Sequence, residues 1–165
     1  MRRPQRPHRG FTLVEMMVTI AIAALLGVMV VPNLIDMVDS GKTSVLVNKF
    51  PQDVAWARNQ AVTTQQAVSM ALSSSSCDWQ TTVGAGTVAE HSMSNAATEY
   101  PGVQCKITNP PASGTLFFTP QGLVTDGPGG TPASPTITVT ARQGQTWILQ
   151  MLGSGTVILN SNTAS

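Results

Sequence analysis

The residues of this chain that could take part in chemistry are few and widely spaced. Its two histidines, His8 and His91, have no neighbours at the spacing of a metal site, a nucleophile elbow or a phosphate-binding loop. The acids Asp78, Glu90 and Glu99 lie in a polar segment that lacks the spacing of an EF-hand. We therefore expect His8 to have no role, His91 to be solvated, and the three acids to be structural or solvated, and we expect no enzyme activity, no metal and no other cofactor.

One carboxylate differs from the others because of where it lies. Glu15 is the only charged residue in the apolar stretch 11–35. An unbroken helix of that length would span about 37 Å, more than the roughly 30 Å hydrocarbon core of a bilayer. A carboxylate in such a helix is costly at mid-bilayer, less so at the headgroups, and calls for a partner. Two roles are open for Glu15: a boundary residue at the headgroups, or one half of an ion pair.

The charges around this stretch set its orientation. Four arginines precede residue 11, whereas all eight acids follow it. By the positive-inside rule the leader stays in the cytoplasm and everything after residue 35 lies on the far side of the membrane. The stretch is longer than the apolar core of a removable secretory signal, and residues 31–36 offer no small-residue cleavage site. We therefore expect the apolar helix to be retained.

The order Gly10-Phe11-Thr12-Leu13-Val14-Glu15, between a short basic leader and an apolar helix containing Pro32, resembles the class III signal of type IV prepilins and type II secretion pseudopilins. The resemblance implies that a prepilin peptidase cleaves between Gly10 and Phe11, and that the new Phe11 amine is methylated. The helix then serves as membrane anchor and filament core, in which Glu15 pairs with the Phe11 ammonium of a neighbouring subunit and fixes the register. Pro32 is expected to kink the helix.

Beyond residue 35 the pattern changes from uniformly apolar to amphipathic. Apolar side chains recur at three- and four-residue steps, which predicts that residues 36–66 continue the helix and pack one face on a globular domain. Pro51 within this pattern predicts a restart of the helix or a second kink. The side chains expected in the core are Val45, Leu46, Phe50, Val54, Ala57, Ala61 and Val62.

The remainder of the chain has the pattern of short strands. Alternating or β-branched runs are separated by turns rich in Pro, Gly and Ser, which predicts one mostly antiparallel domain over residues 67–165. The polar residues 73–100 are expected to form a long irregular excursion from the sheet. The predicted strands lie at 66–73, 103–108, 115–119, 136–141, 146–152 and 156–159.

This order of elements, with the segments 55–59 and 116–122 and a strand pair around Gly153, is similar to the GspH/FimT subgroup of minor pilins and H-type pseudopilins. The resemblance implies an α+β, pilin-like fold in which a long N-terminal helix, membrane-spanning in its first half, packs on a small antiparallel β-sheet domain. It divides the chain into a cleaved leader (1–10), a transmembrane and filament-core helix (11–35), an amphipathic continuation (36–66) and a periplasmic GspH/FimT-like domain (67–165).

The only two cysteines, Cys77 and Cys105, both fall in the part expected to lie in the periplasm. An oxidising compartment favours their pairing, and the closed loop would stabilise the fold by about 3 to 4 kcal/mol. We expect a disulfide. Buried free thiols and a metal pair are the alternatives, although the latter lacks further ligands at zinc-finger spacing.

Nucleic acid is a possible partner because some minor pilins of this subgroup are DNA receptors. DNA binding at physiological salt depends on several Lys or Arg contacts to phosphates. After Arg58 the only basic residues are Lys106 and Arg142, and the segment 152–160 contains none. We therefore expect no nucleic-acid partner and assign no DNA-binding residues.

Three candidate functions are consistent with the sequence. The first is a minor type IV pilin, a structural subunit that primes pilus assembly or lies at the pilus tip. The second is the H-type pseudopilin of a type II secretion system, and the lesser third is a DNA-binding pilin for natural transformation. Each implies other pilin or pseudopilin subunits, the prepilin peptidase and inner-membrane lipid as partners. Each also places the chain in the bacterial inner membrane before it enters a pilus or pseudopilus.

Overall fold

The structure is a computed structural model that describes residues 11–162, and for residues 32, 33, 36, 40 and 162 it describes the backbone alone. The leader 1–10, and with it the expected cleavage after Gly10, lies outside the described residues. The chain divides into two compact units, Met1–Val38 and Asp39–Ser165. Each unit is described by itself below.

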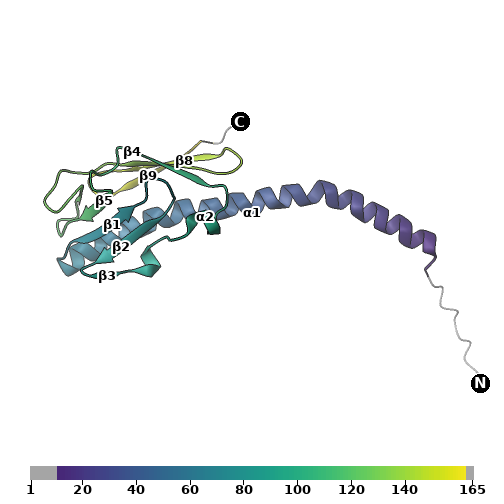
Figure 1. Cartoon of the computed structure of the whole chain (residues 1–165), viewed down its shortest axis with the longest axis horizontal. Coiled ribbons are helices and arrows are strands. Elements are labelled where there is room, and N and C mark those ends of the chain that lie inside the picture. The colour runs from purple at the N-terminus through teal and green to yellow at the C-terminus, as the bar shows by residue number, and fades with distance from the viewer. Residues whose placement is uncertain (1–10, 163–165) are drawn as a thin grey trace, which may run out of the picture. The chain divides into compact units, whose positions relative to one another are not determined.

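Helix α1 (Leu13–Thr64) is the longest element and belongs to both units (Figure 1). It passes through Pro32 and Pro51 without a break, so the predicted restart at Pro51 is wrong. Phe50 and Val54, on either side of Pro51, are buried, and their packing holds the backbone helical although proline lacks an N–H. The kink expected at Pro32 stays a prediction.

In the second unit α1 buries one face. Leu46, Phe50, Val54, Ala57 and Ala61 are all buried, as their spacing predicts. The stripe is narrower than expected, because Val45 is 58% exposed and Val62 is 41% exposed. Val47 is buried in place of Val45, so the predicted face was displaced slightly around the helix axis.

Two antiparallel sheets make up the rest of this unit. The first sheet has the order β3-β2-β1-β5-β6, and its strands are β1 (Val68–Leu72), β2 (Trp79–Val83), β3 (Gly86–Thr87), β5 (Thr115–Phe118) and β6 (Val124–Thr125). The second sheet has the order β4-β7-β8-β9, and its strands are β4 (Gln104–Thr108), β7 (Thr136–Thr140), β8 (Thr146–Met151) and β9 (Val157–Asn162).

The two sheets and α1 share one core. Apolar side chains of the helix, such as Phe50 and Val54, belong to the same cluster as Met70 of β1 and Leu149 of β8. The sheets also meet through the backbone, because the Val124 N–H of β6 donates to the Gly153 carbonyl at the end of β8 (2.8 Å).

The segment between β1 and β4 is ordered, so the predicted irregular excursion over residues 73–100 is wrong. Besides β2 and β3 it contains the short helices η1 (Ala89–His91) and α2 (Ala96–Glu99). The inward side chains of β2 include Thr81, which is fully buried yet polar. Hydrogen bonding therefore replaces the apolar alternation by which strands are usually recognised.

Candidate assembly sites

The first candidate site is the apolar surface of α1 in the N-terminal unit. Residues Leu13–Val31 form a helix long and apolar enough to cross a membrane, with a mean hydropathy of 2.5 and none of its residues buried. Leu13 is 75% exposed and Met17 is 64% exposed. An apolar surface of this extent marks a membrane or protein contact rather than a face open to water.

Glu15 lies in the first turn of this helix. Its N–H donates to the Thr12 hydroxyl oxygen at 3.2 Å, so Thr12 and Glu15 form one half of a capping box. An acid in the first turn also interacts favourably with the helix dipole. Among the described residues, the ion pairs do not include Glu15. The capping role was not foreseen from the sequence, although Thr-x-x-Glu before an apolar run is its usual signature.

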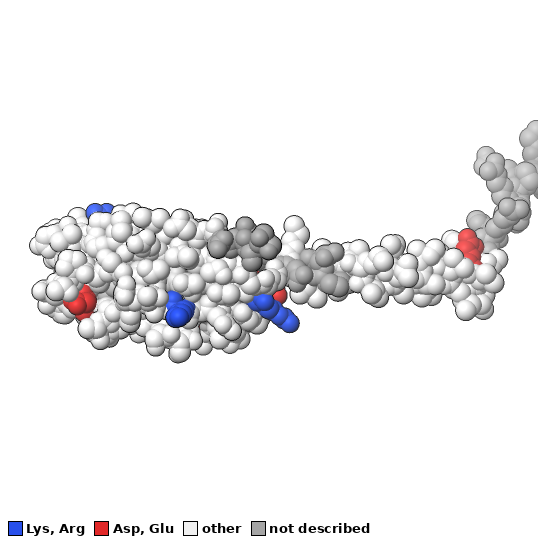
Figure 2. All heavy atoms as spheres, turned by 90° about the horizontal axis from the view of Figure 1, so that it is seen from above, with Lys and Arg blue, Asp and Glu red and all other residues white. Residues whose placement is uncertain are grey.

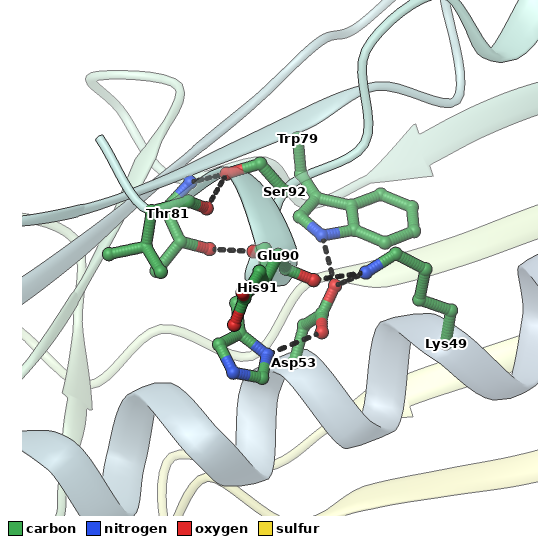
Figure 3. A network of polar contacts seen from close by, with 8 residues as sticks. Lys49, Asp53, Trp79, Thr81, Glu90, His91 and Ser92 are labelled. Carbon is green, nitrogen blue, oxygen red and sulfur yellow. Dashed lines mark hydrogen bonds and ion pairs between the residues drawn. The ribbon is translucent and has the colours of Figure 1, made fainter.

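The second candidate site is a polar cluster beneath η1 in the globular unit (Figure 3). Its centre is Asp53 of α1, whose side chain is 3% exposed. Asp53 Oδ2 accepts from Lys49 Nζ and from the Trp79 indole Nε1, both at 2.9 Å. Asp53 Oδ1 lies 3.0 Å from His91 Nδ1. One buried carboxylate thereby joins α1, β2 and η1.

His91 is held on two sides, so the expectation that it is solvated is wrong. Besides its contact with Asp53, its ring stacks on Trp56 with centroids 3.9 Å apart and planes 18° from parallel. Lys49 also holds η1, because its Nζ donates to the Glu90 carbonyl at 2.8 Å. The side chains of α1 thus hold both residues of η1 that face it (Figure 3).

The cluster includes Asp, His and Ser, the residue types of a hydrolase triad, but their contacts are structural. The Ser92 hydroxyl donates to the Val88 carbonyl at 2.6 Å and accepts from the Thr81 N–H at 2.9 Å. The Thr81 hydroxyl donates to the His91 carbonyl, not to its ring. Neither hydroxyl is therefore bonded to the imidazole, and the arrangement functions as a clamp.

One signal for this clamp is present in the sequence. Lys49 and Asp53 are four residues apart on a helix, a spacing that allows a pair. Asp53 also lies between Phe50 and Val54 on the buried face, where a carboxylate needs partners. The partners from β2 and η1 could not be located without the fold.

The third feature is the disulfide. Cys77 and Cys105 are bonded, with their Cα atoms 5.3 Å apart, which confirms the expected pair. The bond links the loop before β2 to β4, and so joins the two sheets. The described cysteines include no free thiol, and the described residues contain no cluster of three metal-ligating side chains.

Charge is sparse on this unit. On the face drawn in Figure 2 the Lys and Arg side chains of the described residues are few and scattered. Lys49 is paired with Asp53, and the Nε of Arg58 donates to the Gly122 carbonyl at 3.0 Å. The expectation that the chain has no nucleic-acid partner stays a prediction.

Two protein families match this chain. The model of the prokaryotic N-terminal methylation motif matches residues 5–31. The model of the type II transport protein GspH family matches residues 46–156. No curated protein matches the chain.

Two solved structures resemble the fold, both of the type IV minor pilin FimU of Pseudomonas aeruginosa strain PAO1. One crystal form shares 16% sequence identity and a TM-score of 0.52, covering 78% of this chain and 98% of FimU. The other shares 16% identity and a TM-score of 0.48, covering 73% and 98%. At this identity the first likeness shows the fold alone, and the expected pilin-like α+β fold is confirmed.

Proposed function

The chain belongs to the type II transport protein GspH family, and from this premise we propose that it is a minor type IV pilin, a structural subunit that primes pilus assembly or lies at the pilus tip. The observation that carries the proposal is an apolar helix with no buried residue, which the methylation-motif model matches and which has a single acid in its first turn.

The mechanism is assembly through this helix. Cleavage after Gly10 would give Phe11 a free amine, which is positively charged at neutral pH. Glu15 has an exposed side chain and no ion-pair partner among the described residues. Out of water, its carboxylate and the Phe11 ammonium of a neighbouring subunit would attract each other strongly, and leaving either unpaired would be costly. The pair would therefore favour one axial register over others.

Substituting Glu15 tests the pairing directly. Glu15→Gln keeps a side chain that can complete the capping box but removes the charge, whereas Glu15→Ala removes both. If Glu15 pairs with an amine, both variants enter the membrane and lose their leader, yet both are depleted in sheared filaments. Immunoblots of the membrane and of the sheared fraction measure this.

The capping role predicts a different outcome. If Glu15 serves the helix end alone, Glu15→Gln is incorporated as the natural chain is and only Glu15→Ala is depleted. Normal incorporation of Glu15→Gln would contradict the ion-pair mechanism.

Processing is tested at the natural N-terminus. Mass spectrometry of the natural protein should find a methylated Phe11 as the first residue. Gly10→Leu should block cleavage and leave a precursor about 1 kDa heavier. A mature protein that begins at Met1, or that lacks the apolar helix, would contradict the proposal.

The second candidate is an H-type pseudopilin of a type II secretion system, which the GspH family match favours. It would use the same helix, processing and partners in a short periplasmic filament. Deleting the gene separates the two: loss of surface pili indicates the pilus, and loss of protein secretion with intact pili indicates the pseudopilus.

A further inference from the structure

The edge strand β9 is exposed along most of its length, from Ile158 to Ser161. It forms one end of the four-stranded sheet, pairs only with β8, and has six residues without a charge or a proline. Natural proteins normally protect such edges with Lys, Pro or very short strands. The other described edge strands are protected in this way. Strands β3 and β6 have only two residues each. Strand β4 contains Lys106, is held by the Cys105 disulfide and is followed by Pro110.

The backbone of β9 presents a regular row of unused hydrogen-bonding groups. The Leu152 N–H donates to the Thr156 carbonyl at 2.9 Å, and the β8–β9 register continues from this pair. Because bonded and non-bonded pairs alternate in an antiparallel ladder, residues 158 and 160 bond to β8. The N–H and C=O groups of Val157, Leu159 and Ser161 therefore point away from β8, and they have no hydrogen-bond partner among the described residues.

The side chains of β9 leave an apolar face uncovered at the same edge. Leu159 pairs across the sheet with Leu149, yet Leu149 is 1% exposed and Leu159 is 40% exposed. On the other face Ile158 is 42% exposed. The apolar surface of the sheet thus extends to the edge and ends there with no strand beside it.

A groove lies at the start of this edge, between the β8–β9 turn and α1. Its volume is about 340 Å³, and Val157 lies on one side with Ala55 and Asn59 of the helix on the other. The one charged residue that lines it, Arg58, already donates to the Gly122 carbonyl. Apart from Arg58, the groove offers small, uncharged side chains at the start of the row of free backbone groups.

We propose that β9 is a docking site for an extended, uncharged segment of a different filament subunit, which adds a strand to the four-stranded sheet and lays its side chains in the groove beside α1. Only an extended backbone matches donors and acceptors that repeat at every second residue. The lack of charge on β9 selects an apolar or neutral polar segment. The inference rests on the proposed function in that the partner is another subunit of the filament.

A second copy of this chain does not fit this edge in a filament. Antiparallel pairing of β9 with β9 would relate the two copies by a two-fold axis normal to the sheet. That axis reverses every direction in the plane of the sheet, including that of the α1 segment packed on it. Subunits anchored in one membrane by the same end share one direction, which excludes this pairing. The other described edges, β3, β4 and β6, are short or protected and do not offer a strand either, so we assign the partner strand to a different chain.

Hydrogen exchange of the full chain tests the proposal. In the monomer in detergent micelles, the amides of Val157, Leu159 and Ser161 should exchange within seconds while those of Ile158 and Asn160 are protected by β8. In sheared pili or isolated pseudopili all five should be protected. Unchanged fast exchange in the filament would overturn the docking site and leave the proposed function intact.

Other results are equally decisive. If the chain is found in neither filament, both the proposed function and the docking site are wrong. If the purified chain alone forms dimers in which these amides are protected, the partner is a second copy and the assignment to a different subunit is wrong.

Matched variants give a second readout. Leu159→Pro removes an outward N–H that β8 does not use, and Leu159→Ala removes the same side chain but keeps the N–H. We expect Leu159→Pro to lower incorporation about tenfold more than Leu159→Ala, as for one lost backbone hydrogen bond. If thermal unfolding shows that the Leu159→Pro variant is unfolded, the Ser161→Pro and Ser161→Ala variants are compared instead. Equal incorporation of the proline and alanine variants would contradict strand addition.

Discussion

Replacing Asp53 by alanine should destabilise the globular unit far more than any other loss of a single acid. The carboxylate is the acceptor for the Trp79 indole N–H, and Trp79 is 5% exposed. A buried donor left without an acceptor costs about 1 to 3 kcal/mol. Lys49 and His91 are each about one quarter exposed and can turn to water, so their lost contacts add about 0 to 1 kcal/mol each.

The expected loss in the free energy of unfolding is therefore about 1 to 5 kcal/mol, a large share of the 5 to 15 kcal/mol typical of a domain. It corresponds to a fall in melting temperature of roughly 4 to 20 °C. Urea and thermal unfolding of the full chain in detergent micelles, followed by tryptophan fluorescence, measure it. All three tryptophans (Trp56, Trp79 and Trp147) lie in the unit Asp39–Ser165, so the signal reports that unit.

Two comparisons isolate the cause. Glu90→Ala removes the same charge from an exposed side chain on η1 and should change stability by less than about 0.5 kcal/mol. In a Trp79→Phe background there is no indole N–H to leave unpaired, so Asp53→Ala should cost about 1 to 3 kcal/mol less. If Asp53→Ala costs no more than Glu90→Ala, or costs the same in both backgrounds, the clamp does not stabilise the fold as argued.

Two further predictions concern other parts of this unit. Tyr100 is the only tyrosine, and burial, with the neighbouring Glu99 as the smaller cause, raises its pKa above the ordinary 10.0. The fold therefore favours the neutral phenol, and this stabilisation is complete below pH 10.0 and is lost as the pH rises through the folded-state pKa. Absorbance at 295 nm should titrate above 10.0 in the folded chain, return to it in denaturant, and shift only part of the way in Glu99→Gln; a folded-state midpoint at or below 10.0 would refute the stated causes. The variant with both Cys77→Ser and Cys105→Ser should lose about 2 to 4 kcal/mol in urea unfolding without reductant, since the bond closes a loop of 28 residues; equal stability of the two chains would show that the bond does not constrain the unfolded state.

The strands that the sequence predicted are those whose apolar residues alternate. Val68, Met70 and Leu72 of β1, and Trp147, Leu149 and Met151 of β8, point the same way at every second position. β2 was missed because its buried position 81 is a threonine, which the Ser92 hydroxyl and the His91 carbonyl satisfy. β6 was missed because two residues are too few to show a period.

The candidate sites also divide into those that the sequence shows and those that only the fold shows. The position of Glu15 in an apolar helix was evident from composition, because a lone charge in such a stretch is conspicuous. The clamp around Asp53 was not evident, because it joins residues up to 41 positions apart along the chain. The open edge of β9 depends on strand order and hydrogen-bond parity, and neither is contained in a local pattern.

The distribution of charge connects these features. Three of the described charged side chains, Lys49, Asp53 and Arg58, hold α1 to the loops and strands around it. The surfaces available to other subunits, the apolar half of α1 and the edge β9, are almost without charge. Charge complementarity can therefore contribute little to the choice of partner at β9. Backbone pairing and side-chain shape must supply the specificity for that partner. Adding one charge at β9, as in Ile158→Lys, should then reduce filament incorporation at both low and high salt, because its effect is desolvation rather than screened repulsion.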